Sequence, residues 1–307
     1  MGGELPFRNR RELLFYYYSS MLSAVLIALV LMLLCWPRAS AAAPGVSPSS
    51  SGLDSGAGWS SSPVPSSVSS SDVSGAYIDS LASAPGTVPL SAEKPASYFR
   101  DAVFVGDAFT EGLLLYNTVE GLGEDNLAAS TNLNPARLSE AGLTTDADGQ
   151  ACTLAERVIS LHPKKLYFLL GSNGVAWLDP QGMADNCAAF LQEIDKALPD
   201  CNIYVQSIFP FTASLCQSNT SYDNADVRAY NELLYQMAVD NGWHFVHTYA
   251  ALAGEDGALP ESLSGDGVHI GPDGYQRWIA YLQSHTAEKQ AQTQIVFSES
   301  SATEPSE

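Results

Sequence analysis

The stretch that decides the fold is residues 103–112, Val-Phe-Val-Gly-Asp-Ala-Phe-Thr-Glu-Gly. An apolar run ends here in a Gly-Asp pair and continues into a helix-like segment, so the stretch predicts a buried strand that turns sharply into a helix. In α/β folds such a turn lies at the carboxyl end of a strand, beside free backbone N–H groups of the helix start, where reactive groups are placed. The residue at its apex is Ala108, whose methyl group carries no chemistry.

Four further apolar runs follow within residues 96–287, namely Asn126–Ser130, Leu166–Leu170, Ile203–Phe209 and Trp243–His247. They are continuous rather than alternating, which is typical of parallel strands that are covered on both faces. Between and after them, apolar residues recur at helical spacing in three segments, the last of which begins with Pro272. The pattern predicts a three-layer α/β/α sandwich with a parallel sheet of about five strands.

The amino-terminal region predicts a membrane anchor. Residues 13–36 are strongly apolar and long enough to cross a bilayer. Several arginines lie in residues 1–12 and one follows closely at Arg38, so we expect residues 1–12 to be cytoplasmic and the rest extracytoplasmic. The alternative is a cleaved signal peptide, because residues 39–43 are small. Both interpretations place the domain outside the cytoplasm, on the cell membrane in the first case.

Two segments beside the domain have the composition of disordered chain. Residues 37–95 are rich in Ser, Pro, Gly and Ala, and residues 288–307 are polar and end in an acidic stretch. Segments of this kind bury too little apolar surface to offset the entropy of ordering. We therefore expect a flexible stalk before the domain and a disordered tail after it.

Charge and cysteine content exclude several classes of function. The chain of 307 residues has 14 Lys and Arg against 34 Asp and Glu, a formal charge of -20, so a nucleic acid partner is not expected. No Cys/His cluster has zinc spacing and no Gly-rich loop fits a phosphate cradle, so neither a metal nor a cofactor is predicted. Four cysteines follow the apolar segment, and their spacing does not assign disulfides.

Two groups of polar residues follow predicted strands. Asn173 comes directly after the strand at Leu166–Leu170, at an edge where ligands bind in α/β folds. Asp266 and His269 lie three residues apart in a Gly-rich turn before the last helix. This spacing lets the carboxylate accept a hydrogen bond from one imidazole nitrogen and leaves the other nitrogen facing the cleft, as in an oriented general base.

The segments Phe104–Asp107, Leu170–Asn173 and Asp266–His269, in this order, resemble the SGNH or GDSL hydrolases, a family of exported esterases and acylhydrolases. The resemblance covers most of the domain and implies a flavodoxin-like topology. It also implies a base at His269, an orienting carboxylate at Asp266 and a side-chain oxyanion donor at Asn173. The second-block glycine of the family falls at Asn132, and Asp107 of the first block joins the expected site.

The resemblance also implies a nucleophilic serine directly after the Gly-Asp pair, where this chain has Ala108. Deleting the nucleophile of a triad enzyme lowers turnover by about 10⁶-fold. Covalent acyl transfer by the family route is therefore expected to be absent. The change at Asn132 is mild, because Asn keeps its N–H and tolerates left-handed backbone conformations.

Other ways to retain catalysis stay open. Thr110, Ser130 or Thr131 could replace the serine, although such residues more often cap helices and loops. His269 could instead activate a water molecule while Asn173 holds the carbonyl oxygen. The sequence thus leaves two hypotheses, a binding protein for acylated glycans or lipids of the cell envelope and an ester hydrolase of reduced activity. In the plainest interpretation, Asn173, Asp266 and His269 only stabilise turns.

Overall fold

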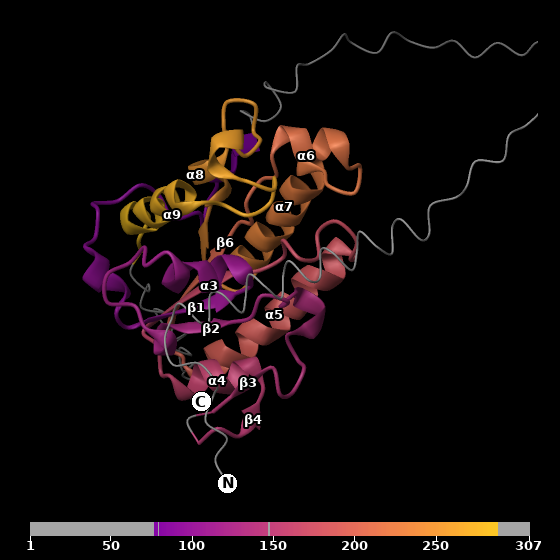
Figure 1. Ribbon diagram of the computed structural model, residues 1–307. Helices are drawn as coiled ribbons and strands as arrows, with labels where there is room; N and C mark the ends of the chain where they lie inside the picture. The colour runs from indigo at the N-terminus through magenta and orange to yellow at the C-terminus, as the bar shows by residue number, and fades with distance from the viewer. Residues whose placement is uncertain (1–76, 79, 147, 288–307) are drawn as a thin grey trace, which may run out of the picture. The chain divides into compact units, whose positions relative to one another are not determined.

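The computed structural model describes residues 77–287, except for residues 79 and 147 (Figure 1). At its centre is a parallel five-stranded sheet in the order β2-β1-β5-β6-β7. Taken in chain order, this is the strand order 2-1-3-4-5 of flavodoxin-like folds, so the predicted fold class is confirmed. The strands are β1 (Ala102–Gly106), β2 (Leu127–Ala129), β5 (Lys165–Leu169), β6 (Asn202–Gln206) and β7 (His244–Val246).

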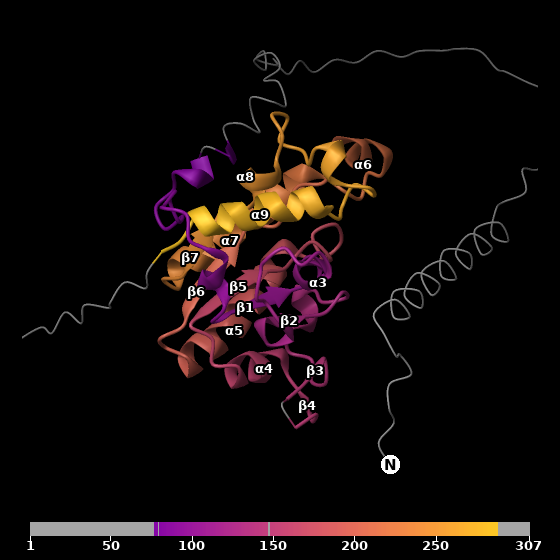
Figure 2. The same cartoon turned by 60° about the vertical axis from the view of Figure 1, so that its left-hand side comes forward.

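Helices cover both faces of the sheet (Figures 1 and 2). On one face α5 packs between α4 and α7, and on the other α9 packs against α8 and contacts α3 through Tyr275. The helices are α3 (Ala108–Leu115), α4 (Leu154–Ser160), α5 (Pro180–Ala197), α6 (Ala213–Ser218), α7 (Asn224–Asp240), α8 (Tyr249–Leu252) and α9 (Pro272–Ser284). Short 3-10 turns are η1 (Ala96–Phe99), η2 (Glu124–Asn126), η3 (Pro135–Arg137) and η4 (Glu261–Leu263).

A ladder of aromatic rings crosses the middle of the sheet. Phe104 and Tyr167 are register partners on β1 and β5, with ring centroids 5.0 Å apart and nearly parallel planes. Tyr167 stacks in turn on its partner Tyr204 of β6 at 4.6 Å. All three rings are buried. Stacked cross-strand pairs of this kind stabilise the register of the sheet.

The buried face of α9 places that helix on the sheet. The indole N–H of Trp278 donates to the side-chain oxygen of Gln206, the last residue of β6, at 2.7 Å. Both side chains are fully buried, so this bond satisfies polar atoms that water does not reach. It also ties the middle of α9 to the carboxyl end of β6.

Two details of the strands differ from the sequence-based expectation. β6 ends at Gln206 rather than Phe209, because Ile208 donates its backbone N–H to the side chain of Asn231 instead of to a neighbouring strand. A small antiparallel hairpin, β3 (Thr144–Thr145) with β4 (Ala151–Cys152), was not predicted. Its strands are two residues long and show no periodicity that the sequence could reveal.

The predicted start of the domain at residue 96 is too late. Val88 is buried and its backbone N–H donates to Phe245 of β7 at 2.8 Å, while Ser91 and Lys94 donate to the last turn of α9. Described residues between 77 and 95 therefore belong to the folded domain rather than to the stalk. Tyr77, Leu81 and Val88 in this Ser- and Pro-rich region reach the core, which composition alone does not indicate.

The expected anchor and tail lie outside the described residues. The structure does not describe residues 13–36, residues 1–12 that we expect to be cytoplasmic, the expected stalk up to residue 76 or the expected tail 288–307. Within the described part of the chain, every helix is too short or too polar to span a bilayer. Cys152, Cys187 and Cys216 hold free thiols.

His247 is a fully buried histidine directly after β7, and it predicts an acid-sensitive stability. Among the described residues, neither of its ring nitrogens has a hydrogen-bond partner, and its ring stacks on Tyr249 at 6.0 Å. Burial lowers the pKa of His247 to about 4. The unfolded chain takes up this proton below its ordinary pKa of about 6.5, whereas the folded protein does not. Stability therefore falls as the pH drops from 6.5 towards 4.

We expect His247→Phe to remove this loss, which amounts to about 1 to 2 kcal/mol at pH 5. The measurement is the melting temperature of the full-length protein in detergent at pH 7.5 and pH 5. The matched control is His162→Asn, at an exposed histidine whose φ of 47° suits Asn. A His247→Phe protein that loses as much stability between the two pH values as the natural protein contradicts the assignment.

Candidate active site

The Gly-Asp turn places Ala108 at the first position of α3. β1 ends at Gly106, and Asp107 caps α3 by accepting a hydrogen bond from the backbone N–H of Phe109 at 3.1 Å. A Cβ at Gly106 would overlap the carbonyl oxygen of Leu169 and the hydroxyl of Thr110, so the turn requires glycine there. Ala108 is partly exposed at the carboxyl edge of the sheet, at the position where the family resemblance implies a serine.

The side chain of Asp107 lies beneath the site. It is 1% exposed, and burial raises its pKa to about 7, while the Phe109 N–H and the nearby His269 act in the opposite direction. A carboxyl group with this pKa is only partly ionised at neutral pH. Asp107 thus acts as a helix cap here, with no exposed oxygen through which to contact a ligand.

Asp266 and His269 form the hydrogen-bonded pair that their spacing predicts. Asp266 Oδ2 lies 2.7 Å from His269 Nδ1, and Oδ1 accepts the backbone N–H groups of Val268 and His269 at 2.9 and 2.8 Å. Burial acts to raise the pKa of Asp266, but these hydrogen bonds outweigh it and hold that pKa below its ordinary value. The ionised carboxylate therefore holds a proton on Nδ1 and leaves Nε2 available to a ligand.

The loop after β6 supports the Asp–His turn. Thr212 donates its backbone N–H to the carbonyl of Gly267 at 3.0 Å. Gly267 has a φ of 87°, and a Cβ there would lie only 2.7 Å from a side-chain atom of Leu215 in α6. The turn is therefore packed tightly against α6, although the side chains of Asp266 and His269 are 57% and 55% exposed.

The structure brings His269 beside the first turn of α3. The ring of His269 lies 5.5 Å from the ring of Phe109, the residue next to Ala108. Tyr275 of α9 donates its hydroxyl to the Phe109 carbonyl at 2.9 Å, and a Cβ at Gly112 would overlap that hydroxyl. These contacts place His269 beside the first turn of α3, which Ala108 begins.

Asn173 ties two loops of the site together. Its side-chain amide donates to the carbonyl oxygens of Thr131 and Leu133, both at 3.0 Å. Both N–H groups of the amide are therefore engaged. To hold an oxyanion, Asn173 would have to exchange one of these bonds for the ligand, so its predicted role stays a prediction.

Asn132 lies at the tip of the loop that Asn173 holds. Its side chain is exposed, and its carbonyl accepts a hydrogen bond from Arg137 at 3.3 Å. Among the described residues other than glycine, only Asn117 and His162 have positive φ angles. The left-handed conformation that Asn tolerates is therefore not used at position 132. A residue other than glycine fits there without an unusual backbone conformation.

The side chains that could substitute for the serine have other roles. Thr110 is 1% exposed and packs under the turn, against Gly106. Thr131 donates its hydroxyl to Glu111, an acidic residue in the first turn of α3 that the sequence analysis did not single out. Ser130 is partly buried and donates its backbone N–H to Gly106. None of these three contacts indicates an activated nucleophile.

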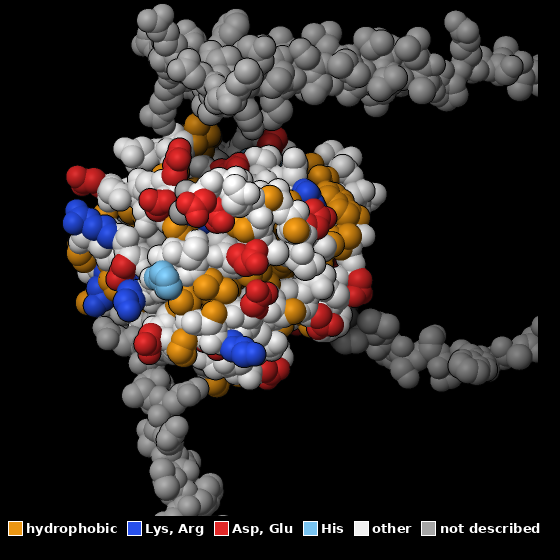
Figure 3. All heavy atoms as spheres, turned by 90° about the horizontal axis from the view of Figure 1, so that it is seen from below, with side chains coloured by type: hydrophobic (Ala, Val, Ile, Leu, Met, Phe, Trp, Pro, Cys, Tyr) orange, Lys and Arg blue, Asp and Glu red, His pale blue; other side chains and the backbone are white. Residues whose placement is uncertain are grey.

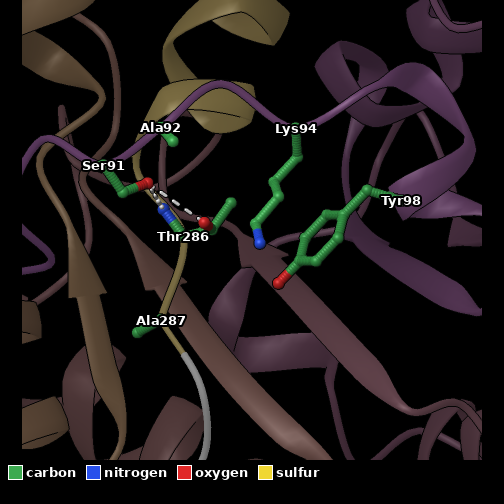
Figure 4. Close-up of a pocket in the computed structure, with 6 residues that line it drawn as sticks. All are labelled: Ser91, Ala92, Lys94, Tyr98, Thr286 and Ala287. Atoms are coloured by element: carbon green, nitrogen blue, oxygen red, sulfur yellow. Dashed lines mark hydrogen bonds between the residues drawn. The ribbon is translucent and has the colours of Figure 1, made fainter.

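A small cavity of about 140 Å³ lies at the other end of the sheet (Figure 4). Tyr98 in its wall bonds Tyr204 of β6, and Lys165, the first residue of β5, lies over the Tyr98 ring. These contacts place the cavity at the amino ends of the strands, away from Ala108 and His269. It is lined by residues of the segment before β1 and of the chain after α9, namely Ser91, Ala92, Lys94, Tyr98, Thr286 and Ala287.

Solved structures with a similar chain course come from several bacteria. A Streptococcus pneumonia protein, provisionally described as a platelet activating factor, is 18% identical, with a TM-score of 0.48, and the match covers 69% of this chain and 89% of that chain. A GDSL-like lipase from Bacteroides thetaiotaomicron is 21% identical, with a TM-score of 0.47, and coverages of 62% and 88%. Likenesses at this level are too distant to indicate activity or ligand.

A peptidoglycan O-acetylesterase is 14% identical, with a TM-score of 0.40 and coverages of 50% and 43%. No curated protein matched the sequence. The sequence profile of the GDSL-like lipase/acylhydrolase family matches residues 104–277, from β1 into α9. Because this match covers more than half of the chain and includes the Gly-Asp turn, Asn173 and the Asp266–His269 pair, the chain belongs to the GDSL-like lipase/acylhydrolase family.

Proposed function

We propose that this chain is a membrane-tethered, extracytoplasmic member of its family that binds an acylated glycan or lipid of the cell envelope and does not transfer acyl groups covalently. The observation that carries the proposal is Ala108 at the start of α3, beside a His269 that Asp266 still orients. A methyl group cannot attack a carbonyl carbon. The apolar residues 13–36 and the net charge of -20 support the tether and argue against a nucleic acid.

The retained groups suit recognition of an ester. Nε2 of an oriented His269 can hydrogen-bond an ester oxygen, and the dipole of α3 favours partial negative charge near the start of the helix. These interactions bind a ground-state ester without a covalent step. An acyl group placed at the turn would then meet the methyl of Ala108, which is compatible with binding.

A second candidate function is slow hydrolysis by a water molecule that His269 activates. The observation that favours it is the Asp266–His269 pair itself, whose bond of 2.7 Å prepares the imidazole to accept a proton. In this case the chain is an ester hydrolase of low turnover. His269 takes a proton from a water molecule, and that water, rather than a side chain, attacks the carbonyl carbon.

The test compares hydrolysis of a chromogenic acetyl ester by the natural full-length protein and by His269→Ala, both in detergent. We expect the two rates to agree within about twofold, because no step of the proposed function requires the base. An exposed imidazole hydrolyses activated esters by itself, so His162→Asn, which removes a surface histidine, measures that background. Activity in the natural protein that disappears in His269→Ala overturns the proposal in favour of the second candidate.

A further inference from the structure

Two aromatic side chains, Trp177 and Tyr222, form a corner on the surface of the domain. Their ring centroids lie 6.5 Å apart and their planes are 82° to each other, so one ring stands as a wall beside the other. Trp177 is 62% exposed, although Val175, two residues earlier, is buried. An indole side chain with this much exposed area contributes little to the packing of the core. Its exposure indicates a surface that another molecule covers.

The loops that carry this aromatic corner also carry or hold residues of the candidate active site. Trp177 is four residues after Asn173, in the same turn after β5, and its backbone N–H donates to Gly174 at 2.9 Å. The ring of Tyr222 contacts the ring of Phe211, just after β6, at 5.0 Å. The next residue, Thr212, holds the Asp266–His269 turn. The loops that carry the corner are therefore the loops that position Asn173 and His269.

The charges around the corner select against an anion. The chain has no Lys or Arg at residues 166–195 or 197–227, the two segments that supply the corner. Exposed carboxylates follow both rings in the chain, Asp179 two residues after Trp177 and Asp223 directly after Tyr222, and each caps a helix with one oxygen at 2.7 Å from a backbone nitrogen. On the face drawn in Figure 3, acidic side chains are likewise spread widely, whereas basic ones gather mainly at one edge. Phosphate-bearing and other anionic ligands would be repelled here.

We propose that the aromatic corner is a subsite for an uncharged sugar ring, which makes an acylated glycan, rather than a lipid, the ligand of the site. One face of a pyranose presents C–H bonds with partial positive charge, which matches the negative face of an aromatic ring. Its hydroxyl groups can donate to carboxylates such as Asp179 and Asp223. A lipid chain instead needs a concave apolar surface that encloses it, and the corner is open and flanked by charge. This inference rests on the proposed function, because it names the ligand of the same site.

The test measures binding of a neutral β-1,4-linked tetrasaccharide of N-acetylglucosamine to the full-length protein by isothermal titration calorimetry. A polyoxyethylene detergent is used, because glucoside and maltoside detergents carry the same chemistry as the ligand. We expect Trp177→Ala to weaken binding by about tenfold or more, and Tyr222→Ala to weaken it severalfold. Trp177→Phe, which keeps an aromatic face, should retain most of the affinity. Leu90→Ala, which removes an exposed apolar side chain elsewhere, should change nothing.

Three outcomes overturn the inference. They are no binding by the natural protein, equal binding by Trp177→Ala, and preferential binding of tetramethylammonium, which would make the corner a cation site. His162→Asn, at an exposed histidine outside the two segments that supply the corner, should bind the sugar as well as the natural protein does. A result without sugar binding therefore contradicts the sugar subsite alone. The ester test of the proposed function is not affected by it. If sugar binds but the ester test fails, the subsite stands and the proposed function falls.

Discussion

Replacing Ala108 by serine is expected to raise the rate of ester hydrolysis by at least about 100-fold over the natural protein. The substituted hydroxyl would start α3, beside the His269 ring that contacts Phe109, and the Asp266–His269 pair is already oriented to take its proton. Full activity of a natural triad enzyme is not expected, because both N–H groups of Asn173 are engaged. The measurement is turnover of a chromogenic acetyl ester by the full-length protein.

Two variants make that result specific. Ala108→Ser combined with His269→Ala should fall back to the rate of the natural protein, because a serine without a base is a weak nucleophile. Ala136→Ser, which adds a hydroxyl at an exposed position of η3, should leave the rate unchanged. If Ala108→Ser folds normally and gains nothing, the turn does not place residue 108 in line with His269.

Gly106→Ala is expected to destabilise the domain by about 3 kcal/mol, a decrease in melting temperature of roughly 6 to 12 °C. The added Cβ would overlap the backbone oxygen of Leu169 on β5, which cannot move without separating β1 from β5, and the hydroxyl of Thr110. The measurement is thermal unfolding followed by the fluorescence of the buried Trp243 and Trp278.

The matched control is Gly123→Ala, because a Cβ at Gly123 would meet nothing within 4 Å. Its melting temperature should stay within about 2 °C of the natural protein. Adding Thr110→Ala to Gly106→Ala should not restore stability, since the contact with the Leu169 carbonyl remains. A Gly106→Ala protein as stable as the control would mean that β1 and β5 are spaced differently at the Gly-Asp turn.

Much of the fold could be predicted because strands buried on both faces must be apolar throughout. The runs around Phe104, Tyr167 and Tyr204 were visible for this reason, and the sequence order of the blocks placed them in one sheet. The stacking of these rings was not visible, because it depends on the register between strands. The packing of Val88 on β7 was hidden as well, since one apolar side chain in a Ser- and Pro-rich segment has no periodic signal.

The candidate site could likewise be predicted only in part. The Asp266–His269 contact is local, three residues apart in one turn, and its spacing predicted the geometry. The bonds of Asn173 reach a loop about 40 residues earlier in the chain, so no sequence pattern could show that both of its N–H groups are engaged. Trp177 and Tyr222 likewise meet only after β5 and β6 are paired.

The central claim is that an intact Asp–His pair faces a position from which the nucleophile has been lost. Labelling with a fluorophosphonate, followed by intact-protein and peptide mass spectrometry, tests it without knowledge of the natural ligand. We expect no adduct on the natural protein, one adduct at position 108 of Ala108→Ser, and none when His269→Ala is added. An adduct on the natural protein, or a folded Ala108→Ser protein that stays unlabelled, would contradict the account.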